Sequence, residues 1–368
     1  MKKEAEMLLP YAQHAINASD EEAVSAVLRD AALGAPITRG PHTQWFERDL
    51  AAFLDCSSAQ VVCTSSGTTA LLLAFWTLAE RYSFKHFVVS DLTFTVTKRM
   101  MRAIARDANI HVLPCREGED GLVCLEAVEK FCESSFSADA LGCLVSLGGR
   151  EISPTILQDM RDSGTVLVED ACHSLSPGYC SRNKMEYWSA KCFSFHPSKL
   201  ITTGEGGAVV FGNAQIAERA RIIRDSGLVR GQREPWAYLL VPGMNCHMSE
   251  MQAALGCSQL KRAAGFYARR KRLARVYIEA FDSLQPLIWF PVNRNNHWHL
   301  FDVSARTPLG SSIKWNALRD YGISRVVHYP INNWVIKHRT TLPLYPSLTR
   351  EEQERVIVAV TRICKGRA

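Results

Sequence analysis

Short apolar segments alternate with helix-like segments over residues 61–225, and this alternation limits the possible folds more than any other feature of the chain. Strand-like segments rich in β-branched and aromatic residues occur at 86–89, 110–113, 141–147, 165–169, 191–195 and 208–211. Helix-like segments between them occur at 69–82, 96–107, 122–133 and 154–162. Apolar strands that alternate with helices build a mostly parallel sheet covered on both faces. We therefore expect an α/β domain.

A second sequence pattern begins with residues 248–281, which form one long helical repeat with an apolar face. Strand-like pieces follow at 299–305 and 326–329, and another helical pattern ends the chain. This order is typical of a smaller α+β domain joined to the first domain by a long helix. We expect residues 1–245, with the N-terminal segment, to form the large domain and residues 246–368 to form the connecting helix and the small domain.

Charge and cysteine content bear on whether the protein binds nucleic acid or a metal ion. The 43 Lys and Arg residues exceed the 37 Asp and Glu residues by six, and this excess permits acidic substrates such as phosphates without requiring nucleic acid. The twelve cysteines include no Cys-x-x-Cys pair and no Cys/His cluster with zinc spacing. We expect free cytosolic thiols, no metal site and no nucleic-acid partner.

Targeting signals also bear on the class of protein. No apolar stretch of signal-peptide length follows the first lysines. The longest apolar-rich run, residues 69–79, is too short to span a bilayer. We therefore expect a cytoplasmic protein without membrane contact.

Two segments combine polar side chains with places where ligands bind. Residues 64–71 form a small polar turn directly before an apolar helix, and the free N–H groups and hydroxyls of such a helix start can hold a phosphate. Asp170 stands at the carboxyl end of an apolar strand, where ligands of open α/β sheets bind. The alternative for residues 64–71 is an ordinary N-capped turn, and the alternative for Asp170 is a capping or turn residue. No G-x-G-x-x-G follows a strand, so a dinucleotide fingerprint is absent.

Two further segments contain candidate functional side chains, one with an amine and one with an amide. Lys199 lies between a strand and the Gly/Thr-rich loop 200–207, where its amine can form a Schiff base with an aldehyde cofactor or remain a surface lysine. Asn245 precedes the long helix, where it can donate to a phosphate or cap the helix. A phosphate cradle, then Asp170, then a lysine 29 positions later describes a pyridoxal-phosphate site.

The order of these segments resembles the DegT-type sugar aminotransferase family of fold-type-I, pyridoxal-phosphate-dependent nucleotide-sugar aminotransferases. The similarity covers nearly the whole chain in the blocks ITRGP, SSGTTALLLAF, DLTFTVT, VEDACHS, FSFHPSKLITTGEGGAVV, MNCHMSEMQAALGCSQL, VHYP and LPLYPSLTREEQ. The resemblance implies an aspartate-aminotransferase-like large domain with a mostly parallel sheet and a smaller C-terminal α+β domain.

The resemblance also implies roles for residues around the cofactor ring. Lys199 would be the catalytic lysine that forms the Schiff base and moves the proton. Asp170 would pair with the pyridinium nitrogen, His173 would lie against a ring substituent, and Phe94 would stack on the ring face.

The phosphate end and the substrate side follow from the same resemblance. The cofactor phosphate would be held by Gly67, Thr68, Thr69 and Ser194. Asn245 would reach the phosphate of the neighbouring subunit, which implies a homodimer with shared active sites. His247 stands where many relatives have arginine, and it is a candidate substrate residue together with His328. Cys246 and residues 147–150 also depart from the family pattern.

The reaction implied is transfer of an amino group, with glutamate as the expected donor, onto a keto group of a nucleotide-linked deoxysugar. The VEDACHS block is most similar to the branch that makes 4-amino bacterial sugars, including precursors of pseudaminic acid. A non-catalytic or regulatory pyridoxal-phosphate-binding protein is the alternative, and a lost lysine or an added DNA-binding domain would mark it; the sequence has neither. The nucleotide, the sugar, the aminated carbon and the donor are not fixed by sequence.

Overall fold

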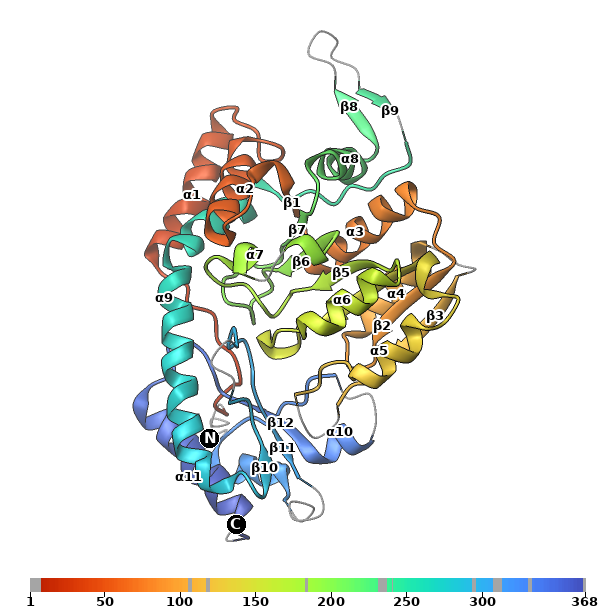
Figure 1. The fold of residues 1–368 in the computed structure, drawn as a ribbon. Helices are drawn as coiled ribbons and strands as arrows, with labels where there is room; N and C mark the ends of the chain where they lie inside the picture. Colours follow the sequence, from red (N-terminus) through yellow and green to blue (C-terminus); the bar gives the residue numbers. More distant parts are fainter. Residues whose placement is uncertain are drawn as a thin grey trace.

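A seven-stranded sheet forms the centre of the larger part of the molecule (Figure 1). The computed structural model describes residues 8–104, 108–116, 120–182, 185–230, 237–239, 241–292, 296–306, 313–329 and 333–366. The strands of this sheet are β1 (Val61–Thr64), β2 (His86–Ser90), β3 (Asn109–Leu113), β4 (Ala140–Val145), β5 (Val166–Asp170), β6 (Ala190–Ser194) and β7 (Gly207–Phe211). They lie in the order β1-β7-β6-β5-β4-β2-β3. β7 runs antiparallel to both of its neighbours, and all the other pairs are parallel.

Helices cover both faces of this sheet, so its strands are buried. The helices are α1 (Ala18–Ala32), α2 (Pro41–Leu54), α3 (Gly67–Arg81), α4 (Thr95–Ile104), α5 (Leu125–Cys132), α6 (Pro154–Asp162), α7 (Tyr179–Arg182) and α8 (Ala214–Arg224). α3, α4 and α8 pack on one face, whereas α2, α5, α6 and α7 pack on the other. The mostly parallel sheet and its six predicted strands are confirmed, whereas the segment that forms β1 was not predicted as a strand. The last three residues of the predicted helix 96–107 lie outside the described residues.

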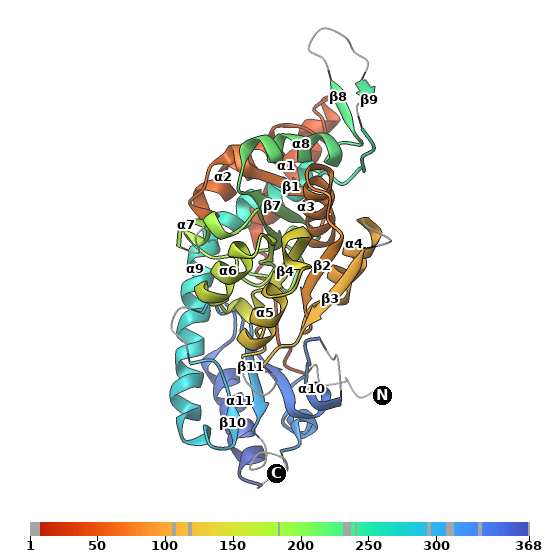
Figure 2. The ribbon, with the colours of Figure 1, turned by 45° about the vertical axis from the view of Figure 1, so that its right-hand side comes forward.

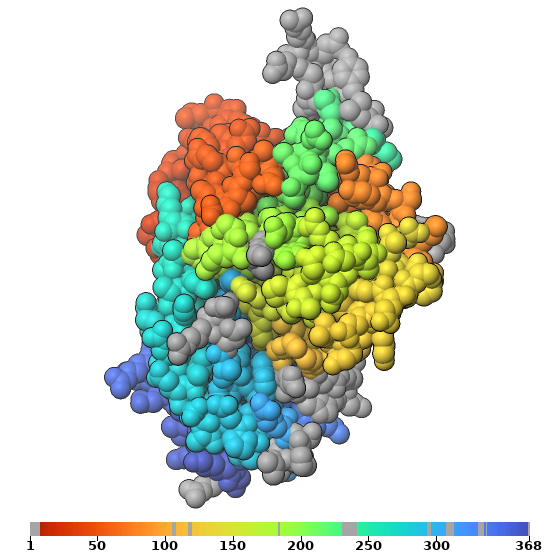
Figure 3. All heavy atoms as spheres, in the orientation of Figure 1, coloured from red at the N-terminus to blue at the C-terminus, as the bar shows by residue number. Residues whose placement is uncertain are grey.

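One long helix, α9 (Glu250–Phe281), connects the two parts of the molecule (Figure 1). Its 32 residues extend over about 48 Å at the usual rise per residue. The first half packs against α1 and α2, and the second half enters the core of the small domain. In the space-filling view of Figure 3, α9 follows one side of the molecule from the N-terminal helices to the C-terminal part.

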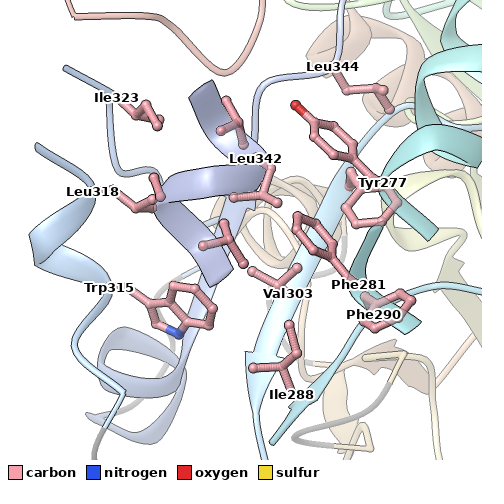
Figure 4. Packing of buried hydrophobic residues seen from close by; sticks show 14 of the residues in the cluster. Tyr277, Phe281, Ile288, Phe290, Val303, Trp315, Leu318, Ile323, Leu342 and Leu344 are labelled. Atoms are coloured by element: carbon pink, nitrogen blue, oxygen red, sulfur yellow. The ribbon is translucent and has the colours of Figure 1, made fainter. Parts of the chain in front are cut away.

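The small domain is built on a three-stranded antiparallel sheet. Its strands are β10 (Ile288–Trp289), β11 (Phe301–Ala305) and β12 (Arg339–Leu342), in that order, with helices α10 (Asn333–His338) and α11 (Arg350–Cys364). Figure 4 shows its core, where Tyr277 and Phe281 of α9 pack beside Leu342. Leu9, at the other end of the sequence, also belongs to this core. The predicted strand at 326–329 is wrong: Val326 makes only one isolated bridge, to Thr341.

The remaining elements are short. A hairpin of β8 (Leu228–Arg230) and β9 (Ala237–Leu239) extends away from the large domain in both ribbon views (Figures 1 and 2). Single 3-10 turns occur at Ser58–Gln60, Ser137–Asp139, Leu147–Gly149, Met185–Tyr187 and Asp282–Leu284, and a longer 3-10 segment occurs at Trp315–Tyr321. Within the described ranges, no helix combines the length and the apolar character that a membrane span requires.

Candidate active site

A cavity of about 450 Å³ opens at the carboxyl ends of β5 and β6. Ligands of open α/β sheets bind at this edge. The predicted site residues that line the cavity are Gly67, Thr68, Phe94, Asp170, His173, Ser194, Lys199 and His328. Thr69, Asn245 and His247 do not line it. The fold therefore brings together residues that are up to 261 positions apart in sequence.

Lys199 follows β6 in a tight turn, where its main-chain N–H donates to the carbonyl of His196 at 2.8 Å. Burial lowers the pKa of its amine below the usual value, although nearby Cys172 and Asp170 act in the opposite direction. Among the described residues, no hydrogen bond to its Nζ is formed. A lowered pKa increases the neutral fraction of the amine, and the neutral amine is the form that attacks an aldehyde.

Asp170 ends β5 and faces the same cavity with only 5% of its surface exposed. Its Oδ2 accepts from the hydroxyl of Thr97 at 3.3 Å, and its Oδ1 accepts from the N–H of Cys172 at 3.2 Å. Burial raises the pKa of this carboxyl group, since a buried anion has lost its water shell. A cationic ring nitrogen at this place would compensate the buried charge.

The start of α3 forms a cradle beside Asp170. Ser66 caps the helix by accepting from the N–H of Thr69 at 3.1 Å, and the Thr69 hydroxyl accepts from the N–H of Ser66 at 3.0 Å. The amides of Gly67 and Thr68 belong to the first turn, where a helix offers no internal acceptor, so they are available to a phosphate. A Cβ on Gly67 would lie 2.7 Å from the Cβ of Ser194, so only glycine lets the helix come this close.

Not all of the predicted phosphate-binding residues face the cavity. Gly67, Thr68 and Ser194 line the cavity and can converge on one anion. Thr69 stands in the helix cap, where its hydroxyl is used by Ser66. Ser66, which the sequence analysis did not single out, lines the cavity as well. The residues present thus fit a phosphate, a planar ring and a reactive aldehyde.

Phe94 stands at the rim of the cavity with 49% of its surface exposed. An exposed aromatic ring beside a cavity can stack on a flat ligand, which would cover its apolar face. Its nearest aromatic neighbour is Tyr329, at a ring centroid distance of 6.2 Å.

Histidine side chains also line the cavity. The His173 ring lies 4.3 Å from that of His299, and burial lowers the pKa of both well below the usual value. Burial likewise lowers the pKa of His328 to about 4. All three are therefore neutral at pH 7 and present nitrogen donors and acceptors rather than charge.

Hydrogen bonds fix the protonated nitrogen of His328. Its Nδ1 lies 2.8 Å from the hydroxyl of Thr341, and that hydroxyl donates to the carboxylate of Asp302 at 2.6 Å. Since the only hydroxyl proton of Thr341 is used, Nδ1 of His328 must be the donor. Nε2 is then the unprotonated nitrogen.

Tyr11, His299 and Tyr329 are among the cavity residues that the sequence analysis did not predict. Tyr11 reaches the cavity because the N-terminal segment crosses the small domain, where the N–H of Leu344 donates to its carbonyl at 3.1 Å. His299 reaches the cavity from the segment just before β11. In the described part of the chain, no group of three or more His, Cys, Asp or Glu side chains is arranged to hold a metal ion.

Two of the predicted residues lie elsewhere on the chain. Asn245 is exposed, and its proposed contact with a neighbouring subunit stays a prediction. His247 lies with its Nδ1 3.6 Å from the carboxylate of Asp225, and burial lowers its pKa. Its predicted substrate contact would therefore have to involve a site other than this cavity.

Two arginines of α9 connect the helix to neighbouring segments. Arg270 is buried and donates to the carbonyls of His299 and Leu344 at 3.0 and 2.6 Å. Arg262 forms an ion pair with Asp20.

The sheet with its single antiparallel strand, the lysine after β6 and the cradle at α3 define an α/β protein of fold type I. Residues 16–361 match the DegT/DnrJ/EryC1/StrS aminotransferase family, and the chain belongs to this family.

Individual relatives agree with this membership. The chain is 27% identical to the spore coat polysaccharide biosynthesis protein SpsC of Bacillus subtilis, with 97% of each chain covered. It is 29% identical to the uncharacterized protein MJ1066 of Methanocaldococcus jannaschii, but over 56% of this chain and only 62% of that protein.

Solved structures share the fold. PseC of Helicobacter pylori, an aminotransferase involved in the biosynthesis of pseudoaminic acid, superposes with a TM-score of 0.85 at 22% identity over 98% of this chain and 100% of that one. The PLP-form of the putative sugar aminotransferase Spr1654 from Streptococcus pneumoniae gives 0.82 at 19% identity over 98% and 100%.

Proposed function

We propose that this chain is a pyridoxal-phosphate-dependent aminotransferase that moves an amino group from glutamate onto a keto group of a nucleotide-linked deoxysugar, at the 4-position. The observation that carries the proposal is the convergence of Lys199, Asp170 and the amides of Gly67 and Thr68 on one cavity. Family membership and the similarity to SpsC and PseC support a sugar as the acceptor.

Three residues of the cavity have distinct roles toward the cofactor in this proposal. Bound pyridoxal phosphate supplies an aldehyde and an electron-withdrawing ring. Asp170 keeps the ring nitrogen protonated through its buried carboxylate, and Phe94 covers one ring face. Lys199 moves a proton between the amino-acid carbon and the cofactor, since its amine has a lowered pKa and no competing partner in the described residues.

The remaining polar residues of the cavity suit a polyhydroxylated acceptor. Tyr11, His299, His328 and Tyr329 offer hydrogen-bond donors and acceptors. Neutral groups can hydrogen-bond sugar hydroxyl and keto oxygens without the cost of burying a charge.

A homodimer with shared active sites completes the proposal. Asn245 is exposed and lies outside the cavity of its own chain. An amide in this position is free to contact a cofactor phosphate held by a second copy.

Absorbance spectroscopy tests the function. We expect purified protein with pyridoxal phosphate to show a yellow Schiff-base band that bleaches when glutamate is added. Lys199→Ala should bind the cofactor without this response and should lose about 10²–10⁴-fold in the rate of proton transfer. Lys130→Ala, which removes an exposed lysine, serves as the control and should behave as the wild type.

The other outcomes distinguish the alternatives. A colourless protein at saturating cofactor would contradict the proposal. A band that forms but responds to no amino acid would favour the non-catalytic or regulatory protein. Nucleotide-linked keto sugars are then tested for their ability to restore the band after bleaching, which identifies the acceptor.

A further inference from the structure

Tyr329 lines the cavity in a strained backbone conformation. Its φ is 54°, in the left-handed region that residues with a Cβ rarely adopt. Strain of this kind persists where the surroundings hold a residue in place, and it is concentrated at functional sites. The ring is held by its neighbours: it lies nearly parallel to His173, at 8° and a centroid distance of 6.0 Å.

A two-step hydrogen-bond relay ends at the Tyr329 hydroxyl. The main-chain N–H of Gly148 donates to Nδ1 of His173 at 3.1 Å. Nε2 of the same ring lies 3.3 Å from the Oη of Tyr329. The peptide group of Gly148 is itself fixed, because its carbonyl accepts from the N–H groups of His299 and Leu300, both at 3.2 Å.

The first bond of the relay fixes the tautomer of His173. A nitrogen that accepts from a peptide N–H carries no proton, and burial holds the pKa of His173 far below neutrality. The single ring proton is therefore on Nε2, and Nε2 donates to Tyr329. Gly148 can take this role because it adopts a φ of 66°, and residues 147–150 are the segment that departs from the family pattern.

The second bond fixes the direction of the phenol proton. Because the Oη of Tyr329 accepts from His173, its own proton is directed to another acceptor. Within the described residues, the Tyr329 hydroxyl has no such acceptor, and the side chain faces the cavity. Burial raises its pKa, so the phenol stays protonated at neutral pH.

We propose that Tyr329 is a substrate-binding residue whose hydroxyl donates a hydrogen bond to an oxygen of the keto-sugar acceptor, with His173 and Gly148 as positioning groups. The inference rests on the proposed function, and it adds a donor that the sequence analysis did not identify. No proton is transferred in this step. His328, whose Nε2 is unprotonated, provides an acceptor in the same cavity.

Separate half reactions test the role of Tyr329. We expect Tyr329→Phe, which keeps the ring, to react with glutamate within about twofold of the wild-type rate. With a UDP-linked 4-keto-6-deoxyhexose as the probe, it should lose about tenfold in the second half reaction, as expected for one missing hydrogen bond. Tyr321→Phe, in the same domain but outside the cavity, is the control and should match the wild type in both.

Different failures have different meanings. If the wild type does not react with glutamate, the proposed function is wrong. If Tyr329→Phe carries out both half reactions at the wild-type rate, the inference is wrong. Equal losses in both half reactions would also overturn it, because the hydroxyl would then act on the donor or the cofactor.

Two measurements test the relay itself. His173→Gln can still accept at one atom and donate from the other, so it should retain the second half reaction to within about threefold, whereas His173→Leu should lose about tenfold. Histidine ¹⁵N NMR reports the tautomer without any turnover. A proton on Nε2 of His173 is the expected result, and a proton on Nδ1 would contradict the inference.

Discussion

Gly67 lies where the first turn of α3 meets the end of β6, with no room for a side chain. An added Cβ would lie 2.7 Å from the Cβ and 3.0 Å from the Oγ of Ser194. We expect Gly67→Ala to separate the cradle amides from Ser194 and to weaken pyridoxal-phosphate binding by on the order of tenfold or more, as the loss of about one charge-assisted hydrogen bond would. Cofactor titration followed by absorbance measures this change.

Gly265→Ala is a matched control for this substitution, because nothing lies within 4 Å of the added Cβ. Its cofactor affinity should equal that of the wild type. If Gly67→Ala also binds with wild-type affinity, the cradle assigned to α3 is wrong.

Residue patterns in the sequence identified the groups that lie at the ends of strands and helices. Asp170 and Lys199 were found because each follows an apolar strand, and the structure places both at the cavity. Thr69 shows what a sequence pattern cannot distinguish. A hydroxyl that caps the helix and a hydroxyl that faces the cavity occupy neighbouring positions in the same turn, and the Thr69 hydroxyl is the one in the cap. Tyr11 and Tyr329 were missed because neither stands in a local pattern that predicts a ligand.

At the scale of the element, α9 contains two glycines with opposite surroundings. Gly256 packs against Phe46 of α2, and an added Cβ would lie 2.7 Å from the ring. Gly265 has open space around it. The same substitution at these two positions therefore separates helix propensity from packing.

We expect Gly256→Ala to lower the free energy of unfolding by about 1–3 kcal/mol through overpacking. Gly265→Ala should raise it by about 0.5–1 kcal/mol, because alanine loses less conformational freedom in a helix. Urea denaturation of both variants measures the difference. A stable Gly256→Ala would contradict the packing of α9 on α2, and a destabilised Gly265→Ala would contradict the open space around Gly265.

Most elements were predicted because their local pattern is strong. The helix predicted at 248–281 is confirmed as α9, beginning two residues later, where Ser249 caps it by accepting from the N–H of Gln252. The predicted strand at 326–329 failed because Val326 makes only an isolated bridge to Thr341, whereas His328 and Tyr329 turn to the cavity instead of pairing in a sheet. β1 (Val61–Thr64) is buried along its whole length and therefore shows no alternation of apolar and polar residues.

At the scale of the whole molecule, buried neutral histidines connect pH to stability. His173, His299 and His328 all have a pKa lowered by burial in the folded state, to about 4 for His328. In the unfolded chain each titrates near 6.5, so the unfolded state binds more protons between about pH 6.5 and 4. Stability is therefore complete above pH 6.5 and falls as the pH is lowered through this range.

We expect the wild type to unfold at a lower temperature at pH 5 than at pH 7, with His328 alone contributing about 2 kcal/mol to the difference. Thermal unfolding followed by circular dichroism measures this effect. His328→Gln should reduce the difference, whereas His14→Gln, which removes an exposed histidine, should leave it unchanged. An identical difference in His328→Gln would mean that this ring is not buried as a neutral group.

The boundary between the two domains, the homodimer and the cytoplasmic location stay predictions. The small-domain core includes Leu9, so the N-terminal segment contacts the C-terminal part of the chain. The sequence pattern does not predict this contact, because the contact depends on which surfaces meet after folding.

The sequence by itself determined the class of sheet and the long helix, which follow from local physics: apolar periodicity and helix capping. The family followed from the resemblance of ordered motifs along the chain, and the position of Asp170 and Lys199 after apolar strands predicted that both would lie at one site. Only the tertiary structure decided which further residues line the cavity, where Tyr11, His299 and Tyr329 meet from three separate segments, and the tautomer of His173. Those features depend on distances between segments far apart in the chain, and such distances are set by packing rather than by local sequence.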